Sequence, residues 1–83
     1  MISPFYQSRK SALKIHIFKT NIRTEQDIFI IRQILNSNPN IITWSVDMED
    51  IDKVLRIESH KDFNEEEIIT MVKLRGLYCE ELE

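Results

Sequence analysis

The sequence predicts an α+β fold with the element order strand, helix, strand, strand, helix, strand, and three observations predict it. Apolar and polar residues alternate in several short stretches, as they do in half-buried strands. Two other stretches carry apolar residues at helical spacing, each behind a residue type that caps helices. Turn-forming residues separate these stretches. The order is that of the split βαβ, ferredoxin-like fold, a four-stranded antiparallel sheet with two helices on one face.

The first strand and the first helix are expected within residues 13–36. The strand at 13–18 has an aliphatic face made of Leu13, Ile15 and Ile17. Its other face carries Lys14, His16 and Phe18. Thr24 stands three residues before Asp27, which resembles a capping box with Asp in place of Glu or Gln. The helix that follows is expected to end at the Asn- and Pro-containing run 36–40.

The second half of the chain predicts a hairpin, a helix and an edge strand. Strands at 42–46 and 53–58 are joined by the short acidic turn 47–52, which favours antiparallel pairing. Asn64 precedes Glu67 by three residues, so a second capping box is expected at the start of the second helix. Gly76 suits the position just past that helix. The last strand, at 77–82, is rich enough in Glu to be an edge.

The composition indicates one small domain without a nucleic-acid partner. The chain has 83 residues and a net charge of −3, whereas proteins that bind nucleic acid need a positive face for the phosphates. Its one cysteine allows no intrachain disulfide. No apolar run approaches the ~18 residues of a membrane helix, and no signal peptide is visible. We expect an N-terminal arm at 1–12, a domain at 13–83 and, by default, a cytoplasmic location.

With these elements placed, the chain resembles the heavy-metal-associated (HMA) domain of copper chaperones and P-type metal pumps, in a bacterial branch of that family. The resemblance covers nearly all of 13–83. It rests on an ordered set of stretches: FKTNI at 18–22, WSVD at 44–47, DKVLRIE at 52–58, the Glu-rich start of the second helix, and Gly76 ahead of a strand ending in EEL. The resemblance implies the same ferredoxin-like fold.

The metal site of that family is Gly-Met-x-Cys-x-x-Cys, at the loop that enters the first helix. In this chain Asn21 stands at the Gly, Ile22 at the Met, Thr24 at the first Cys and Asp27 at the second. Soft thiolates select Cu(I) and suit Zn(II), so the family's metal chemistry does not transfer. Thr24 suits a helix cap and Asp27 the positive end of the helix dipole. The resemblance therefore implies a member without the metal motif.

Few other residues offer chemistry. Cys79 is expected to be a small buried side chain, and His16 and His60 to be surface residues. A metal carrier with non-standard ligands, drawn from Asp27, Cys79 and the two histidines, remains the alternative. The acidic turn 47–52 lacks the Gly and the terminal Glu of an EF-hand loop. No Ser-His-Asp arrangement, phosphate loop or paired carboxylate is visible, so no catalytic residue, cofactor or small-molecule substrate is expected.

The predicted sheet leaves one face uncovered, and that face or an edge strand is the expected contact surface. Trp44 is expected in the core, with a partly exposed anchor for a partner as the alternative. Phe18 and Val54 would form an apolar docking patch if they share the open face. We therefore expect a non-catalytic protein-interaction or regulatory module. Its partner would be another protein or a second copy of the chain, with no nucleic acid and no membrane.

Overall fold

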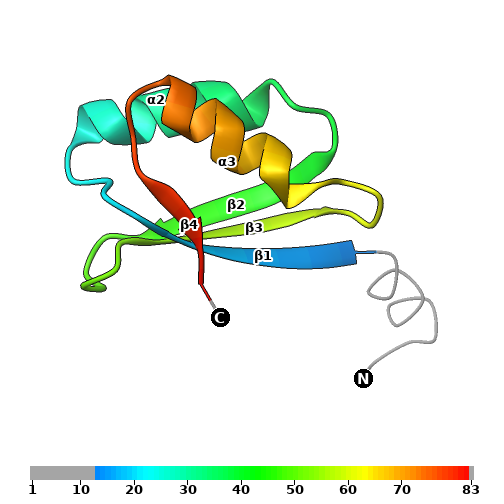
Figure 1. The fold of residues 1–83 in the computed structure, drawn as a ribbon, viewed down its shortest axis with the longest axis horizontal. Helices are drawn as coiled ribbons and strands as arrows, with labels where there is room; N and C mark the ends of the chain where they lie inside the picture. The colour runs from blue at the N-terminus through cyan, green and yellow to red at the C-terminus, as the bar shows by residue number, and fades with distance from the viewer. Residues whose placement is uncertain (1–12, 83) are drawn as a thin grey trace.

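The computed structural model describes residues 13–82 and has the predicted element order (Figure 1). The elements are β1 (Leu13–Thr20), α2 (Glu25–Asn36), β2 (Ile41–Asp47), β3 (Val54–His60), α3 (Glu65–Leu74) and β4 (Cys79–Glu81). The arm expected at 1–12 lies outside the described residues. Within 13–82, neither helix has the length and apolar composition needed to span a membrane.

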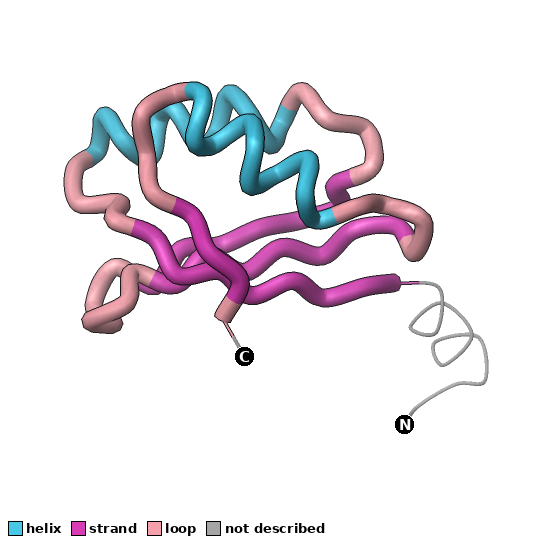
Figure 2. The backbone as a smooth tube through the Cα atoms, viewed as in Figure 1, coloured by secondary structure: helices cyan, strands magenta, loops and turns pink. Residues whose placement is uncertain are grey.

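The four strands form one sheet in the order β2-β3-β1-β4, and every neighbouring pair is antiparallel. Both helices lie on the same side of this sheet, and the other side is left uncovered (Figures 1 and 2). The hairpin of β2 and β3 is therefore confirmed, and β4 is an edge strand as predicted. It is shorter than the predicted 77–82, and it pairs only with the second half of β1.

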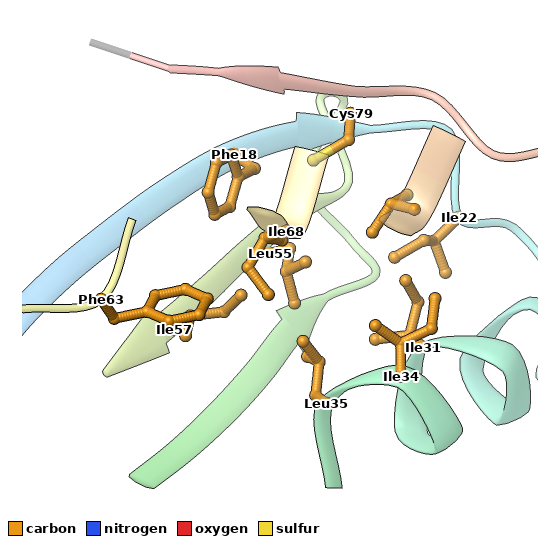
Figure 3. Close-up of a cluster of buried hydrophobic side chains, with 11 residues drawn as sticks. Phe18, Ile22, Ile31, Ile34, Leu35, Leu55, Ile57, Phe63, Ile68 and Cys79 are labelled. Carbon is orange, nitrogen blue, oxygen red and sulfur yellow. The ribbon is translucent and has the colours of Figure 1, made fainter. Parts of the chain in front are cut away.

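The hydrophobic core fills the space between the sheet and the two helices (Figure 3). Every layer contributes to it. Its buried members are Phe18, Ile22, Ile31, Ile34, Leu35, Leu55, Ile57, Phe63, Ile68, Val72 and Cys79. Burial of this apolar surface is the main favourable term in the folding of so short a chain.

The central strand β1 buries the face that carries its aromatic rings. Phe18 is fully buried opposite Leu55, and His16, opposite Ile57, is only 4% exposed. The aliphatic face lies on the uncovered side, where Ile15 is 45% exposed. Pairing with the buried residues of β3 fixes this arrangement, because a slip of one residue would turn every side chain to the other face. The expectation that His16 is a surface residue is therefore wrong.

The two helices begin at the predicted capping residues, but the two caps differ. Thr24 and Asp27 form the expected capping box at α2. At α3 the Asn64 side chain accepts the N–H of Glu66, while the N–H of Glu67 bonds to the Asn64 backbone carbonyl. This is a helix N-cap without the reciprocal bond of a box, so the second capping box is wrong. Gly76 follows α3 at φ +88°, a backbone conformation that residues with a Cβ rarely adopt.

Candidate functional site

The loop that enters α2 is closed by its own hydrogen bonds. Thr24 Oγ1 accepts the N–H of Asp27 at 3.1 Å. In return, Asp27 Oδ2 accepts the N–H groups of Arg23 at 3.0 Å and Thr24 at 3.3 Å. The N–H of Arg23 is the largest of the causes that hold the pKa of Asp27 below its ordinary value, and bonds with Thr24 add to it. Thr24 Oγ1 and Asp27 Oδ2 thus already serve the helix start.

Asn21 and Ile22, which precede this cap, are also held in place by the rest of the fold. Ile22 is fully buried and belongs to the hydrophobic core. Asn21 Oδ1 accepts the backbone N–H of Tyr78 at 2.9 Å, which ties the loop to the segment before β4. Thr20 Oγ1 donates to the Lys53 carbonyl at 2.6 Å and so links the loop to the β2–β3 turn. Each of the four residues that the sequence resemblance placed at the metal motif therefore has a structural role.

Cys79 is a buried thiol, as expected. It lies opposite Thr20 in the sheet and is 1% exposed, with its sulfur directed into the apolar cluster (Figure 3). Burial raises the pKa of Cys79 to about 12, although Lys73 opposes this slightly. Because the thiolate is the form that binds metals, a thiol with so high a pKa is a poor ligand at neutral pH.

Three residues that sequence reasoning did not connect meet beneath the start of α3. His16 Nε2 lies 2.8 Å from Ser59 Oγ, and His16 Nδ1 lies 3.4 Å from Glu65 Oε1. The ring stacks on Phe18, with centroids 6.2 Å apart, and meets Phe63 edge-on at 5.8 Å. The three polar residues come from β1, β3 and α3. His16 and Ser59 each fall on the same face of their strand as its buried residues. Only this pattern in the sequence could have indicated that the two meet.

The order of these contacts, hydroxyl to imidazole to carboxylate, is the order found in serine hydrolases. The surroundings do not suit that chemistry. Ser59 is fully buried, and its hydroxyl donates to the backbone carbonyl of His60 at 3.0 Å. A substrate would have no access to the oxygen, and the hydroxyl also bonds to the backbone of its own strand. We interpret the cluster as part of the folded framework.

The remaining charged candidates do not assemble into a site. His60 is exposed at the end of β3. In the acidic turn, the carboxylates of Asp47 and Asp50 accept N–H groups of the turn itself. The ammonium of Lys53 donates to the Met48 carbonyl at 2.6 Å. Across residues 13–82, no group of three or more His, Cys, Asp and Glu side chains is placed to hold a metal ion.

The uncovered side of the sheet carries an aliphatic stripe along β1. We call this set the open-face stripe; its members are Leu13, Ile15 and Ile17. Ile15 is 45% exposed, and the other two are half-buried. Val54 lies on the same side, because it adjoins the buried Leu55 in β3 and successive residues of a strand point to opposite faces.

Phe18 and Val54 therefore point to opposite sides of the sheet and do not form the shared patch that the sequence suggested. Phe18 is fully buried under the helices. Trp44 also faces the helices, since it pairs with the buried Ile57, and it packs half-buried against the core. Its indole N–H donates to Asn36 Oδ1 at 3.0 Å. Of the three residues proposed for the interaction face, Val54 alone lies on the open side.

Comparison with known proteins gives similarity in structure only. No family model matches the chain, and no curated relative does. Among solved structures, the apo form of the HMA domain of a copper chaperone for superoxide dismutase superposes with a TM-score of 0.72 at 13% identity, covering 86% of this chain and 68% of that one. The copper(I)-loaded first domain of the human copper chaperone for superoxide dismutase gives 0.67 at 14% identity, covering 83% and 92%. The fold is therefore the ferredoxin-like HMA fold.

Proposed function

We propose that this chain is a non-catalytic domain of HMA-like fold that acts as a protein-interaction or regulatory module. The observation that carries the proposal is the closed loop at the start of α2. Where the metal-binding family has two cysteines, Thr24 and Asp27 bond to each other and to the helix start. A metal ion that bound Thr24 Oγ1 and Asp27 Oδ2 together would have to compete with the helix cap, which is worth about 1 kcal/mol. The loop thus has a structural role that needs no ligand.

The open-face stripe supports a contact surface on the uncovered side of the sheet. In an antiparallel sheet, the strand residues on a solvated face are mostly polar. Here the central strand instead presents Leu13, Ile15 and Ile17 in succession, flanked by Arg56 and Glu58 on β3. An apolar strip with a charged border is typical of surfaces that bind another protein. A second copy of this chain is the simplest partner to test.

The experiment compares two substitutions that place a charge on opposite sides of the molecule. Ile15→Asp changes the middle of the open-face stripe, and Leu74→Asp changes an exposed leucine, 78% accessible, at the end of α3. Sedimentation velocity over a wide concentration range reads self-association, and cross-linking in lysate reads other partners. We expect association that Ile15→Asp abolishes and Leu74→Asp retains. A wild-type chain that stays monomeric and cross-links to the same proteins as Ile15→Asp would refute the proposal.

A metal carrier with non-standard ligands is the second candidate, and the fold shared with a copper(I)-loaded domain is the observation that favours it. Its ligands would come from Asp27, Cys79, His16 and His60. In this candidate the chain would have to expose Cys79 and lower its pKa before the thiolate could bind. Titration with metal ions separates the two candidates.

A further inference from the structure

Two side chains of opposite charge flank the open-face stripe on β3. Arg56 lies opposite Ile17 in the pairing of β1 with β3, and Glu58 lies opposite Ile15. Both alternate with buried residues of β3, so they point to the uncovered side of the sheet (Figure 1). Their side chains are 50% and 25% exposed, and Arg56 Nη1 lies 3.3 Å from Glu58 Oε2. The stripe therefore has a positive neighbour beside Ile17 and a negative one beside Ile15.

This order of charges is self-complementary when a second copy of the chain packs face to face in the opposite direction. The two-fold axis then runs between the two sheets, at right angles to β1, and passes midway between Ile15 and Ile17. It places each strand over the same strand of the other copy. Ile15 faces Ile17 of the second copy, and Arg56 faces Glu58 of the second copy. Every such contact occurs twice, as in any isologous interface.

The charges favour this position of the axis over its neighbours. An axis at the level of Glu58 would set that carboxylate against the same carboxylate of the other copy. An axis at the level of Arg56 would do the same to the two guanidinium groups. Like charges that face each other across an interface weaken it. At the midpoint, the residues of β2 beside this pair are neutral, with Ser45 over Thr43 of the second copy.

The size of the sheet sets the strength of such a contact. The sheet has four strands, of which β2 and β3 are seven residues long. At a spacing of about 4.8 Å between strands and a rise of about 3.3 Å per residue, the footprint is at most roughly 450 Å² per copy. Two copies together stay below the ~1,200 Å² of a standard stable complex. The contact should therefore be weak and reversible, and sensitive to charge.

We propose that the uncovered side of the sheet binds a second copy of this chain face to face, through the open-face stripe and two reciprocal contacts between Arg56 and Glu58. The dimer removes the aliphatic stripe from water, which drives the association. The paired charges set the direction in which the second copy lies. This inference rests on the proposed function, since it names the partner of the same surface. It adds the orientation of the two copies and the residues that determine it.

Charge reversal in the full chain tests this orientation. Arg56→Glu sets two pairs of carboxylates against each other, and Glu58→Arg sets two pairs of guanidinium groups. Each variant alone should self-associate at least about tenfold more weakly than wild type. A mixture of the two variants should associate as strongly as wild type, because both contacts are then complementary. Sedimentation velocity at low ionic strength, with a fluorescent label on the N-terminus of one variant, follows the mixed dimer.

The double variant Arg56→Glu/Glu58→Arg gives a second, independent readout. It carries the same charges in the opposite order, so it should dimerise as wild type does. Labelled double variant and unlabelled wild type should form no mixed dimers, since like charges face each other at both contacts. The matched controls are Arg32→Glu and Glu66→Arg, which change the net charge equally at exposed positions of α2 and α3. Alone and mixed, they should associate as wild type does.

The outcomes separate this inference from the proposed function. A mixture of Arg56→Glu and Glu58→Arg that associates no better than either variant would overturn the orientation, as would free mixing of the double variant with wild type. The double variant decides if a single variant does not fold. A monomeric wild type that cross-links in lysate to proteins lost by Ile15→Asp would overturn the dimer and leave the proposed function standing. A monomeric wild type without such proteins would overturn both.

Discussion

Thr24 and Asp27 bond to each other reciprocally at the start of α2. The threonine hydroxyl oxygen accepts the Asp27 N–H at 3.1 Å, and the aspartate carboxylate accepts the Thr24 N–H at 3.3 Å. These bonds satisfy amides at the helix start that have no partner within the helix. The two residues that the sequence resemblance placed at the thiolate positions of the HMA metal motif thus act as a helix cap.

Thr24→Ala should lower the free energy of unfolding by about 1 kcal/mol. The substitution removes the hydroxyl oxygen that accepts the Asp27 N–H, and alanine is a poor N-cap. Urea unfolding followed by Trp44 fluorescence measures the difference. Thr24→Ser keeps the hydroxyl and is the control. Equal losses in the two variants would show that the hydroxyl is not the stabilising group.

The contribution of Asp27 to stability should disappear in acid. Backbone N–H groups, that of Arg23 above all, hold the pKa of Asp27 below its ordinary value of 3.8. The folded chain therefore binds this proton less readily than the unfolded chain does. The stabilisation is complete above the ordinary pKa and is lost as the pH falls through the lower, folded value.

The check is to compare wild type with Asp27→Asn by urea unfolding at about pH 6 and about pH 3, on either side of the ordinary carboxyl range. Wild type should be the more stable at the higher pH, and the difference should shrink at the lower one. A difference that is the same at both pH values would contradict the assigned role of the carboxylate.

Cys79 should react with thiol reagents only when the fold opens. Cys79 is 1% exposed, and burial raises the pKa of its thiol to about 12. Labelling of the native chain at mild alkaline pH should be at least roughly a hundredfold slower than labelling in urea. In the native chain the reagent cannot reach the sulfur, and the thiol is not ionised to the reactive thiolate. Similar rates with and without urea would mean that the β4 edge opens freely.

The two faces of β1 should respond differently to truncation. Phe18→Ala should cost about 3–5 kcal/mol in free energy of unfolding, because it empties a fully buried site in the core. Ile15→Ala should cost less than about 1 kcal/mol, since Ile15 is 45% exposed on the uncovered side. Urea unfolding of both variants measures the contrast. A larger loss for Ile15→Ala would reverse the assignment of the two faces.

The sequence was sufficient for the fold and for the cap at α2. Alternation, helical spacing and capping residues are local patterns, and they predicted the element order, the hairpin and the role of Thr24. The face of β1 that is buried was harder to predict. Leu13, Ile15 and Ile17 look more apolar than the face with His16 and Phe18, yet pairing with Leu55 and Ile57 places the latter in the core.

The contacts of His16 could not be predicted from local patterns. Its partner Ser59 is 43 residues away in the chain, and the contact depends on the register of β1 with β3. Glu65 joins them only because α3 begins over this part of the sheet. Such a cluster is a product of tertiary packing. The same is true of Trp44, whose indole finds Asn36 only after the turn between α2 and β2 has formed.

We propose that the loop at Thr24 and Asp27 needs no metal ion to complete it. The most direct measurement is a titration of the reduced, tag-free chain with Cu(I), Zn(II) and Ni(II) against a competing chelator, followed by urea unfolding. A ligand bound at about 100 times its Kd adds about 2.7 kcal/mol to the free energy of unfolding. We expect no gain with any of the three ions. A gain at one equivalent that Asp27→Asn or Cys79→Ser removes would contradict it and establish a metal carrier.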